Sequence, residues 1–178
     1  MFKKLSEKLI NISDKTTGYG KQIVLKTFKL SNGLVETFFI DKSKDSVEIF
    51  AITKDKKIII VKQFRAGVEK EQLELPGGGL EDQEDPSVAA KRELLEETGY
   101  AGKEVIPLAS VPYSPYSSGH RHLFMTYDCE KVSDLNLDPN EILKVGLIDL
   151  ELFKEKIRKA EIRGYETSFL ALDRMKLL

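Results

Sequence analysis

The chain has 178 residues, and its 28 lysines and arginines nearly balance 29 aspartates and glutamates, for a formal net charge of −1. This balance argues against nucleic acid or an anionic membrane surface as a partner, and the length suits one domain with a small appendage. No apolar run approaches the roughly 20 residues that span a bilayer, and the first residues lack a secretory apolar segment, so we expect a cytoplasmic protein. Cys129 stands alone and is expected to be a buried small hydrophobe without a catalytic role.

Residues 1–45 are expected to form an N-terminal extension. Apolar side chains recur at helical spacing over residues 2–11, which predicts a short amphipathic helix. Residues 23–30 and 34–40 are predicted to be the strands of a β-hairpin, because Ser31-Asn32-Gly33 between them is typical of a turn. A hairpin of that size needs another surface to pack on.

Three further strands are predicted before the first long helix, over residues 46–53, 57–64 and 71–75. The second contains the very apolar run 58–61, which suits the centre of a sheet. The third leads into the loop Pro76-Gly77-Gly78-Gly79, whose glycines permit positive φ angles and close approach of the backbone to a ligand.

A helix of about thirteen residues is predicted to follow this loop. Asp85 is a good N-cap, Pro86 suits the first helical position and Gly99 suits the C-terminal stop. One side of the helix is expected to pack and the other to present carboxylates. The expected apolar side consists of Val88, Ala89, Ala90, Leu94 and Leu95.

Glu93, Glu96 and Glu97 lie at positions i, i+3 and i+4 of this helix and therefore share one face. Like charges at this spacing repel by roughly 0.2–0.5 kcal/mol per pair, and a divalent cation turns the repulsion into attraction. Hard oxygen ligands of this kind suit magnesium or manganese. The pattern thus predicts a metal-carboxylate helix.

The remaining chain is predicted to alternate strands and helices. The predicted strands are residues 104–111, 122–129 and 144–147, and the predicted helices are residues 150–160 and 167–178, with Leu170, Leu172, Met175 and Leu178 as packing positions. A Pro- and Ser-rich loop, residues 112–119, is expected to be structured and functional. This order of elements fits a mixed sheet between helices, over a domain of residues 46–178.

The spacing of Gly78, Glu84 and the segment Arg92-Glu93-Leu94-Leu95-Glu96-Glu97-Thr98-Gly99 resembles a complete Nudix box. The resemblance implies a hydrolase that cleaves a nucleoside diphosphate linked to another moiety and that uses glutamates to hold divalent metal. It also implies a fold of the α/β (α+β) class, a Nudix-like α/β/α sandwich with a mixed central sheet and, here, an N-terminal β-hairpin extension.

Hydrolysis of a pyrophosphate needs neutralisation of the phosphate charge and an activated water. Glu93 and Glu97 are the first candidates for metal ligands and Glu96 is the next, and Glu96 is also a candidate catalytic residue. The resemblance implies that the Gly77 carbonyl also coordinates metal. Arg92 is expected to support catalysis by organising the carboxylates, and Glu84 either binds metal or holds Arg92.

Further segments resemble the ADP-ribose pyrophosphatase branch of the family, including Lys62-Gln63-Phe64-Arg65 and a proline, Pro115, sixteen residues after Gly99. The resemblance implies a loop glutamate that acts on the catalytic water, and Glu141 is the position that matches. The candidates for substrate binding are Arg65, Glu74, Ser114, Pro115 and Tyr116.

Two features of the sequence leave other substrates open. Tyr116 lies near the position that favours dinucleoside polyphosphates, and the chain has no tryptophan to stack on adenine. We therefore predict hydrolysis of ADP-ribose or a related nucleoside diphosphate sugar. The alternatives are a dinucleoside polyphosphate hydrolase, a nucleotide-sugar sensor without turnover, and an interaction domain whose acidic helix is only solvated. The N-terminal segment resembles the portion through which family members form dimers, so we expect a homodimer whose partner contributes to the substrate pocket.

Overall fold

The computed structural model describes residues 3–13, 20–137 and 142–178. The chain divides into two compact units. The first consists of residues 1–45 and 111–121, and the second consists of residues 46–110 and 122–178. Among the described residues, no helix is long and apolar enough to cross a membrane.

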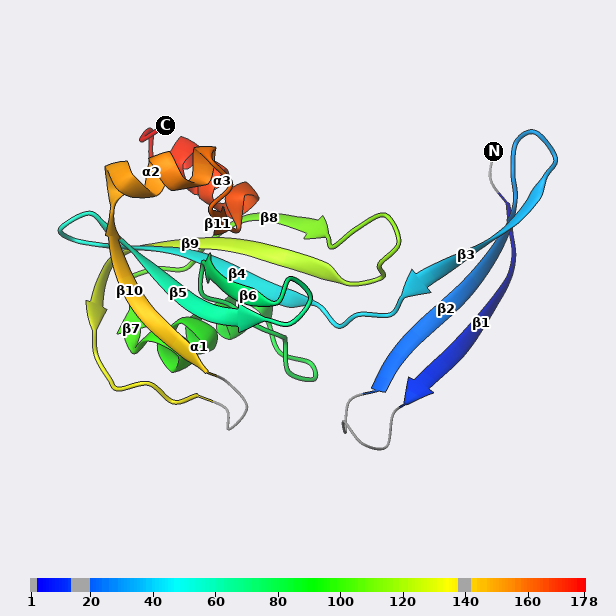
Figure 1. The fold of residues 1–178 in the computed structure, drawn as a ribbon, viewed down its shortest axis with the longest axis horizontal. Helices are drawn as coiled ribbons and strands as arrows, with labels where there is room; N and C mark the ends of the chain where they lie inside the picture. The colour runs from blue at the N-terminus through cyan, green and yellow to red at the C-terminus, as the bar shows by residue number, and fades with distance from the viewer. Residues whose placement is uncertain (1–2, 14–19, 138–141) are drawn as a thin grey trace. The chain divides into compact units, whose positions relative to one another are not determined.

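The first unit contains an antiparallel sheet of β1 (Lys3–Ser13), β2 (Gly20–Lys29) and β3 (Val35–Asp41), in that order (Figure 1). The predicted hairpin of β2 and β3 is present. Its turn is closed by a hydrogen bond from the Gly33 N–H to the Leu30 carbonyl, at 3.0 Å, and Gly33 has a φ of +88°.

The helix predicted over residues 2–11 is wrong, because β1 occupies this segment. Leu9 lies opposite Val24 and Ile10 lies opposite Ile23 in the ladder between β1 and β2. A short apolar set does not distinguish a helix from a strand by spacing alone. Pairing with β2 satisfies the backbone of the segment, and it overrides the local preference.

The Pro- and Ser-rich loop of residues 112–119 belongs to the first unit. Its backbone pairs with the end of β3, where Asp41 donates to the Tyr116 carbonyl at 2.7 Å and Ser118 donates to the Asp41 carbonyl at 2.9 Å. The Tyr116 ring stacks on Phe38, with 6.4 Å between the ring centroids. The loop is structured, as predicted.

The second unit is built on a mixed sheet with the strand order β11-β6-β5-β4-β9-β7, to which β10 adds against β5 and β8 adds against β9. The strands are β4 (Ser46–Thr53), β5 (Lys57–Arg65), β6 (Lys70–Glu74), β7 (Tyr100–Ala101), β8 (Ile106–Pro112), β9 (His120–Lys131), β10 (Leu143–Asp149) and β11 (Ile162–Arg163). The pairing of β11 with β6 is parallel, whereas β5 is antiparallel to β4, β6 and β10. The two-residue strands β7 and β11 were not predicted from the sequence.

Helices cover both faces of this sheet. Helix α1 (Pro86–Thr98) lies on one side, and α2 (Leu150–Arg158) and α3 (Tyr165–Arg174) lie on the other (Figure 1). Side chains of β4 alternate between the two resulting cores, so that Ile49 packs with Leu94 of α1 whereas Phe50 packs with Phe153 of α2. This is the predicted α/β/α sandwich.

The last helix differs from its predicted bounds and packing. It ends at Arg174 rather than Leu178, and it begins at Tyr165, directly after Gly164, which has a φ of +96°. Leu172 is buried as predicted, but Leu170 and Leu178 are exposed. The apolar pattern located the helix but not the face that packs, because the position of β4 beneath the helix decides which residues are covered.

Candidate active site

Helix α1 begins and ends where the sequence analysis placed it. Pro86 is its first residue, and the Asp85 carboxylate accepts a hydrogen bond from the Ser87 N–H at 2.8 Å. Gly99 has a left-handed φ of +72° and donates from its N–H to the Leu95 carbonyl at 2.8 Å. The capping residues thus fix which part of the chain presents the glutamates.

The prediction that one side of α1 packs and the other carries the carboxylates is wrong. Glu93 and Glu97 are 8% and 3% exposed and lie on the buried face, whereas Val88 and Leu95 are 55% and 38% exposed. A carboxylate is buried at low cost only when donors satisfy it. The Gly77 N–H supplies one such donor, because it donates to Glu97 Oε2 at 2.8 Å.

The glycine loop packs tightly between β4 and α1. The Val47 N–H donates to the Gly78 carbonyl and the Ile49 N–H donates to the Pro76 carbonyl, both at 2.9 Å. Gly77 has a φ of +153°, and a Cβ on it would overlap the Val47 carbonyl oxygen. A Cβ on Gly78 would lie only 2.5 Å from Glu93 Oε1. The absence of side chains therefore lets backbone and carboxylates converge.

Arg92 joins three glutamates around this loop. Its Nε and Nη2 donate to the two oxygens of Glu84, each at 2.9 Å, and its Nη1 donates to Glu93 at 2.9 Å and to Glu96 at 3.0 Å. Nη2 also donates to the Gly79 carbonyl at 3.1 Å. The guanidinium thus holds carboxylates from the loop and from α1 in one arrangement.

The ion pair between Arg92 and Glu84 shifts the pKa values of both side chains. The hydrogen bonds from Arg92 lower the pKa of Glu84 to about 2, and the hydrogen bonds from Glu84 in turn raise the pKa of Arg92 above its usual range. Glu84 is therefore ionised at every physiological pH. The predicted contact of Glu84 with Arg92 is therefore present, and metal binding by Glu84 stays a prediction.

The chemistry of the donors fits a hard divalent cation. Four carboxylates gather around the glycine loop: Arg92 pairs with those of Glu84, Glu93 and Glu96, and the carboxylate of Glu97 accepts from the Gly77 N–H. Carboxylate oxygens together with a glycine carbonyl are the ligands that such cations take. Within the described residues, no three Asp, Glu, His or Cys side chains already converge as a metal centre. The proposed ligand set stays a prediction.

The predicted substrate-binding residues fall in different parts of the fold. In the second unit, Arg65 at the end of β5 forms a bidentate ion pair with Glu74 of β6, with both N–O distances at 2.7 Å. Ser114, Pro115 and Tyr116 belong to the loop of the first unit. Glu141, the predicted base, lies outside the described residues.

One buried carboxylate beside the glycine loop, that of Glu48, was missed. Glu48 of β4 is buried and accepts a hydrogen bond from the Thr167 hydroxyl of α3. A charge within the otherwise apolar run of residues 47–52 was the available signal, because a buried charge needs a partner. Cys129 behaves as predicted, since burial raises the pKa of its thiol to about 12 and keeps it protonated.

The NUDIX domain model matches residues 42–167, and the chain belongs to the Nudix family. This match, together with an ADP-ribose pyrophosphatase among the relatives, identifies a hydrolase that acts on pyrophosphate bonds.

Individual relatives cover most of the chain. An ADP-ribose pyrophosphatase of Bacillus subtilis (strain 168) is 31% identical over 169 residues, which are 94% of this chain and 91% of that protein. A methanol dehydrogenase activator of Bacillus methanolicus is 35% identical over 154 residues, covering 85% and 82% of the two chains. The crystal structure of an ADP compounds hydrolase has a TM-score of 0.80 at 19% identity and covers 99% and 97%, which shows the shared fold.

Proposed function

We propose that the protein hydrolyses the pyrophosphate bond of ADP-ribose or a related nucleoside diphosphate sugar, with a divalent cation, to a nucleoside monophosphate and a sugar phosphate. The observation that carries this proposal is the convergence of Glu93 and Glu97 on the glycine loop. The ADP-ribose pyrophosphatase of Bacillus subtilis supports the substrate class, because its similarity spans almost the whole chain.

In this proposal Glu93, Glu96, Glu97 and the Gly77 carbonyl would hold magnesium or manganese. A cation held there supplies charge neutralisation on the pyrophosphate and lowers the pKa of an attacking water. Arg92 orients the carboxylates of Glu93 and Glu96 through hydrogen bonds, and the Gly77 N–H fixes one oxygen of Glu97. Glu141 is the proposed general base, on the family resemblance alone.

Product analysis tests the proposal directly. Purified protein is incubated with magnesium and, in separate reactions, with ADP-ribose, other nucleotide sugars and dinucleoside polyphosphates. We expect adenosine monophosphate and ribose 5-phosphate, with ADP-ribose fastest, and no turnover after chelation by EDTA. Faster cleavage of a dinucleoside polyphosphate would favour a dinucleoside polyphosphate hydrolase. No cleavage of any compound would favour a nucleotide-sugar sensor without turnover.

The role of Glu97 is tested by Glu97→Gln. The substitution keeps the size of the side chain and removes the charge, so we expect kcat to fall by roughly 100-fold while the circular dichroism spectrum is unchanged. The matched control is Glu151→Gln, which makes the same chemical change at an exposed position of α2. Unchanged turnover in Glu97→Gln would contradict the metal assignment.

A further inference from the structure

Glu48 lies in the part of β4 that packs against the glycine loop. Two hydrogen bonds join β4 to this loop, one on each side of Glu48, from the N–H groups of Val47 and Ile49. A Cβ on Gly77 would lie only 2.9 Å from the Glu48 Cα, so the two backbones touch at this point. The position of Gly77 therefore depends on the position of Glu48.

The Glu48 side chain meets the start of α3 on the other face of the sheet. It points to the same face as Phe50, two residues further along β4. Its buried carboxylate accepts from the hydroxyl of the fully buried Thr167, and a Cβ on Gly164 would lie 2.9 Å from Glu48 Oε1. Gly164 has no side chain that could cap α3, and the N-terminus of a helix favours negative charge. The Glu48 carboxylate thus anchors the start of α3 to β4.

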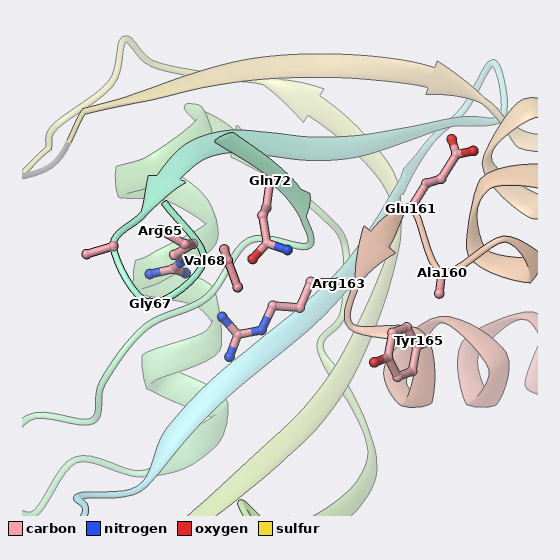
Figure 2. Close-up of a pocket in the computed structure, with 9 residues that line it drawn as sticks. Arg65, Gly67, Val68, Gln72, Ala160, Glu161, Arg163 and Tyr165 are labelled. Atoms are coloured by element: carbon pink, nitrogen blue, oxygen red, sulfur yellow. The ribbon is translucent and has the colours of Figure 1, made fainter. Parts of the chain in front are cut away.

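The segment before α3 also lines a cavity of about 530 Å³ in the second unit (Figure 2). Arg163, the last residue of β11, and Tyr165, the first residue of α3, are two of the lining residues. Arg163 is held independently of Glu48, because β11 pairs with β6 and Arg163 Nη1 lies 3.8 Å from Glu74 Oε2. A substitution that breaks the contact of Glu48 with α3 should therefore leave β11 in place.

Gly77 presents two main-chain groups to the proposed metal site. Its N–H donates to Glu97 Oε2 at 2.8 Å, and its carbonyl is a proposed ligand. Ligand distances in metal sites vary by only about 0.2 Å. Substitution of the residues that orient metal ligands typically lowers metal affinity by about 10–100-fold. A small shift of β4 that moves Gly77 would therefore weaken metal binding.

We propose that Glu48 is a positioning residue of the metal site, because its contact with Thr167 fixes β4 and β4 in turn fixes Gly77. Glu48 acts from the opposite face of the sheet and touches neither metal nor substrate. This inference rests on the proposed hydrolysis with a divalent cation. It adds a contact between β4 and α3 to the features that determine metal affinity.

Manganese binding in the absence of substrate tests this role. The metal-free full chain is titrated with Mn²⁺, and electron paramagnetic resonance measures the free ion. Thr167→Val removes the hydroxyl and keeps the shape of the side chain, so we expect the Mn²⁺ affinity to fall by about tenfold. Thr167→Ser keeps the hydroxyl donor and should bind Mn²⁺ within about twofold of the wild type.

The matched control is Ser168→Ala. Ser168 is buried on the same helix, and its hydroxyl donates to the Gly164 carbonyl at 2.8 Å, within α3. Its loss should destabilise α3 without loosening β4, so the Mn²⁺ affinity should equal that of the wild type. Glu48→Gln keeps an acceptor for Thr167 but removes the charge, so we expect a smaller loss of about threefold. This variant provides the readout if Thr167→Val does not fold.

Hydrogen exchange of the Gly77 amide gives a second readout that needs no metal. Nuclear magnetic resonance on the metal-free protein should show this amide exchanging about tenfold faster in Thr167→Val than in the wild type, and at the wild-type rate in Ser168→Ala. If Thr167→Val and Ser168→Ala have the same Mn²⁺ affinity and the same Gly77 exchange rate, the role of Glu48 is only structural and the inference is overturned.

The two proposals fail in different ways. If wild-type protein binds Mn²⁺ but cleaves no nucleotide sugar, the proposed function fails, whereas the variants still test the role of Glu48. If nucleotide sugars are cleaved and Thr167→Val binds Mn²⁺ as tightly as the wild type, the inference about Glu48 is overturned alone. Wild-type protein that binds no Mn²⁺ would overturn both.

Discussion

Glu84 combines two hydrogen bonds from Arg92 with a third from the Glu81 N–H, at 3.0 Å. Its pKa in the folded chain is about 2, below its ordinary value of 4.5. A lowered folded-state pKa means that ionised Glu84 stabilises the fold above about pH 4.5, and that this contribution is lost as the pH falls toward 2.

We therefore expect Glu84→Gln to lower the melting temperature at pH 7, with a difference from wild type that shrinks between pH 4.5 and pH 2. Thermal unfolding at a series of pH values measures this difference. The control is Glu104→Gln, at an exposed position, which should show a small difference at every pH. If the difference in melting temperature stays constant from pH 7 to pH 2, the ionised Glu84 carboxylate does not stabilise the fold through Arg92.

Three consecutive glycines should respond differently to alanine. Gly77→Ala drives a Cβ into the Val47 backbone and should lower stability by about 1–3 kcal/mol. Gly78→Ala pushes against the end of the Glu93 side chain, so it should reduce activity more than stability. Gly79→Ala meets no atom within 4 Å and is the control. Urea unfolding measures the stability of the three variants, and a turnover assay measures their activity. Equal losses of stability and of activity in all three variants would contradict the prediction.

At the scale of elements, the sequence predicts α1 well because its signals are local. Asp85, Pro86 and Gly99 act on their own turns of the helix, so no tertiary information is needed to place its ends. The faces of the same helix were predicted less well. Burial of Glu97 depends on a donor at Gly77, twenty residues away, which spacing within the helix cannot reveal.

Dependence on partners distant in sequence also explains why β1 and β11 were not predicted. Strand β1 exists because β2 pairs with it, and β11 exists because β6 lies beside it. Both depend on partners distant in sequence, and two residues such as Ile162 and Arg163 carry no periodicity. For the site, the family resemblance located the glutamates, whereas the Arg65–Glu74–Arg163 arrangement required the register of β6 and β11.

Helix α3 should depend on its link to β4. Thr167→Val removes the hydroxyl that donates to the buried Glu48 carboxylate while keeping the shape of the side chain. We expect a loss of about 1–3 kcal/mol in the free energy of unfolding, because a buried charged acceptor loses a donor. Thr37→Val, at the exposed Thr27–Thr37 pair, should change stability by less than about 0.5 kcal/mol. Equal effects in chemical denaturation would contradict a special role for Glu48.

For the whole molecule, the first unit raises the question of assembly. Its sheet leaves Leu5, Leu9 and Phe39 exposed in the single chain. Small sheets need a further surface to cover their apolar side chains. The predicted homodimer would provide one, and it stays a prediction.

Light scattering coupled to gel filtration tests the dimer. We expect a mass of twice the 20.2 kDa of the chain, and a shift toward monomer in Phe39→Glu, which places a charge on the exposed sheet. Leu34→Glu makes the same change in the turn between β2 and β3 and should remain dimeric. A wild-type mass of 20.2 kDa would refute the prediction.

The contact between Glu48 and Gly164 constrains how this sequence can evolve. A Cβ at position 164 would lie 2.9 Å from the Glu48 carboxylate, and Thr167 holds that carboxylate in place. The two positions therefore share one volume, so a side chain can be gained at 164 only after position 48 has become shorter. Order of mutation matters in such a pair. Relatives with a larger residue at 164 should carry a smaller one at 48, and placing that larger residue at 164 of this chain while Glu48 is kept should impair folding.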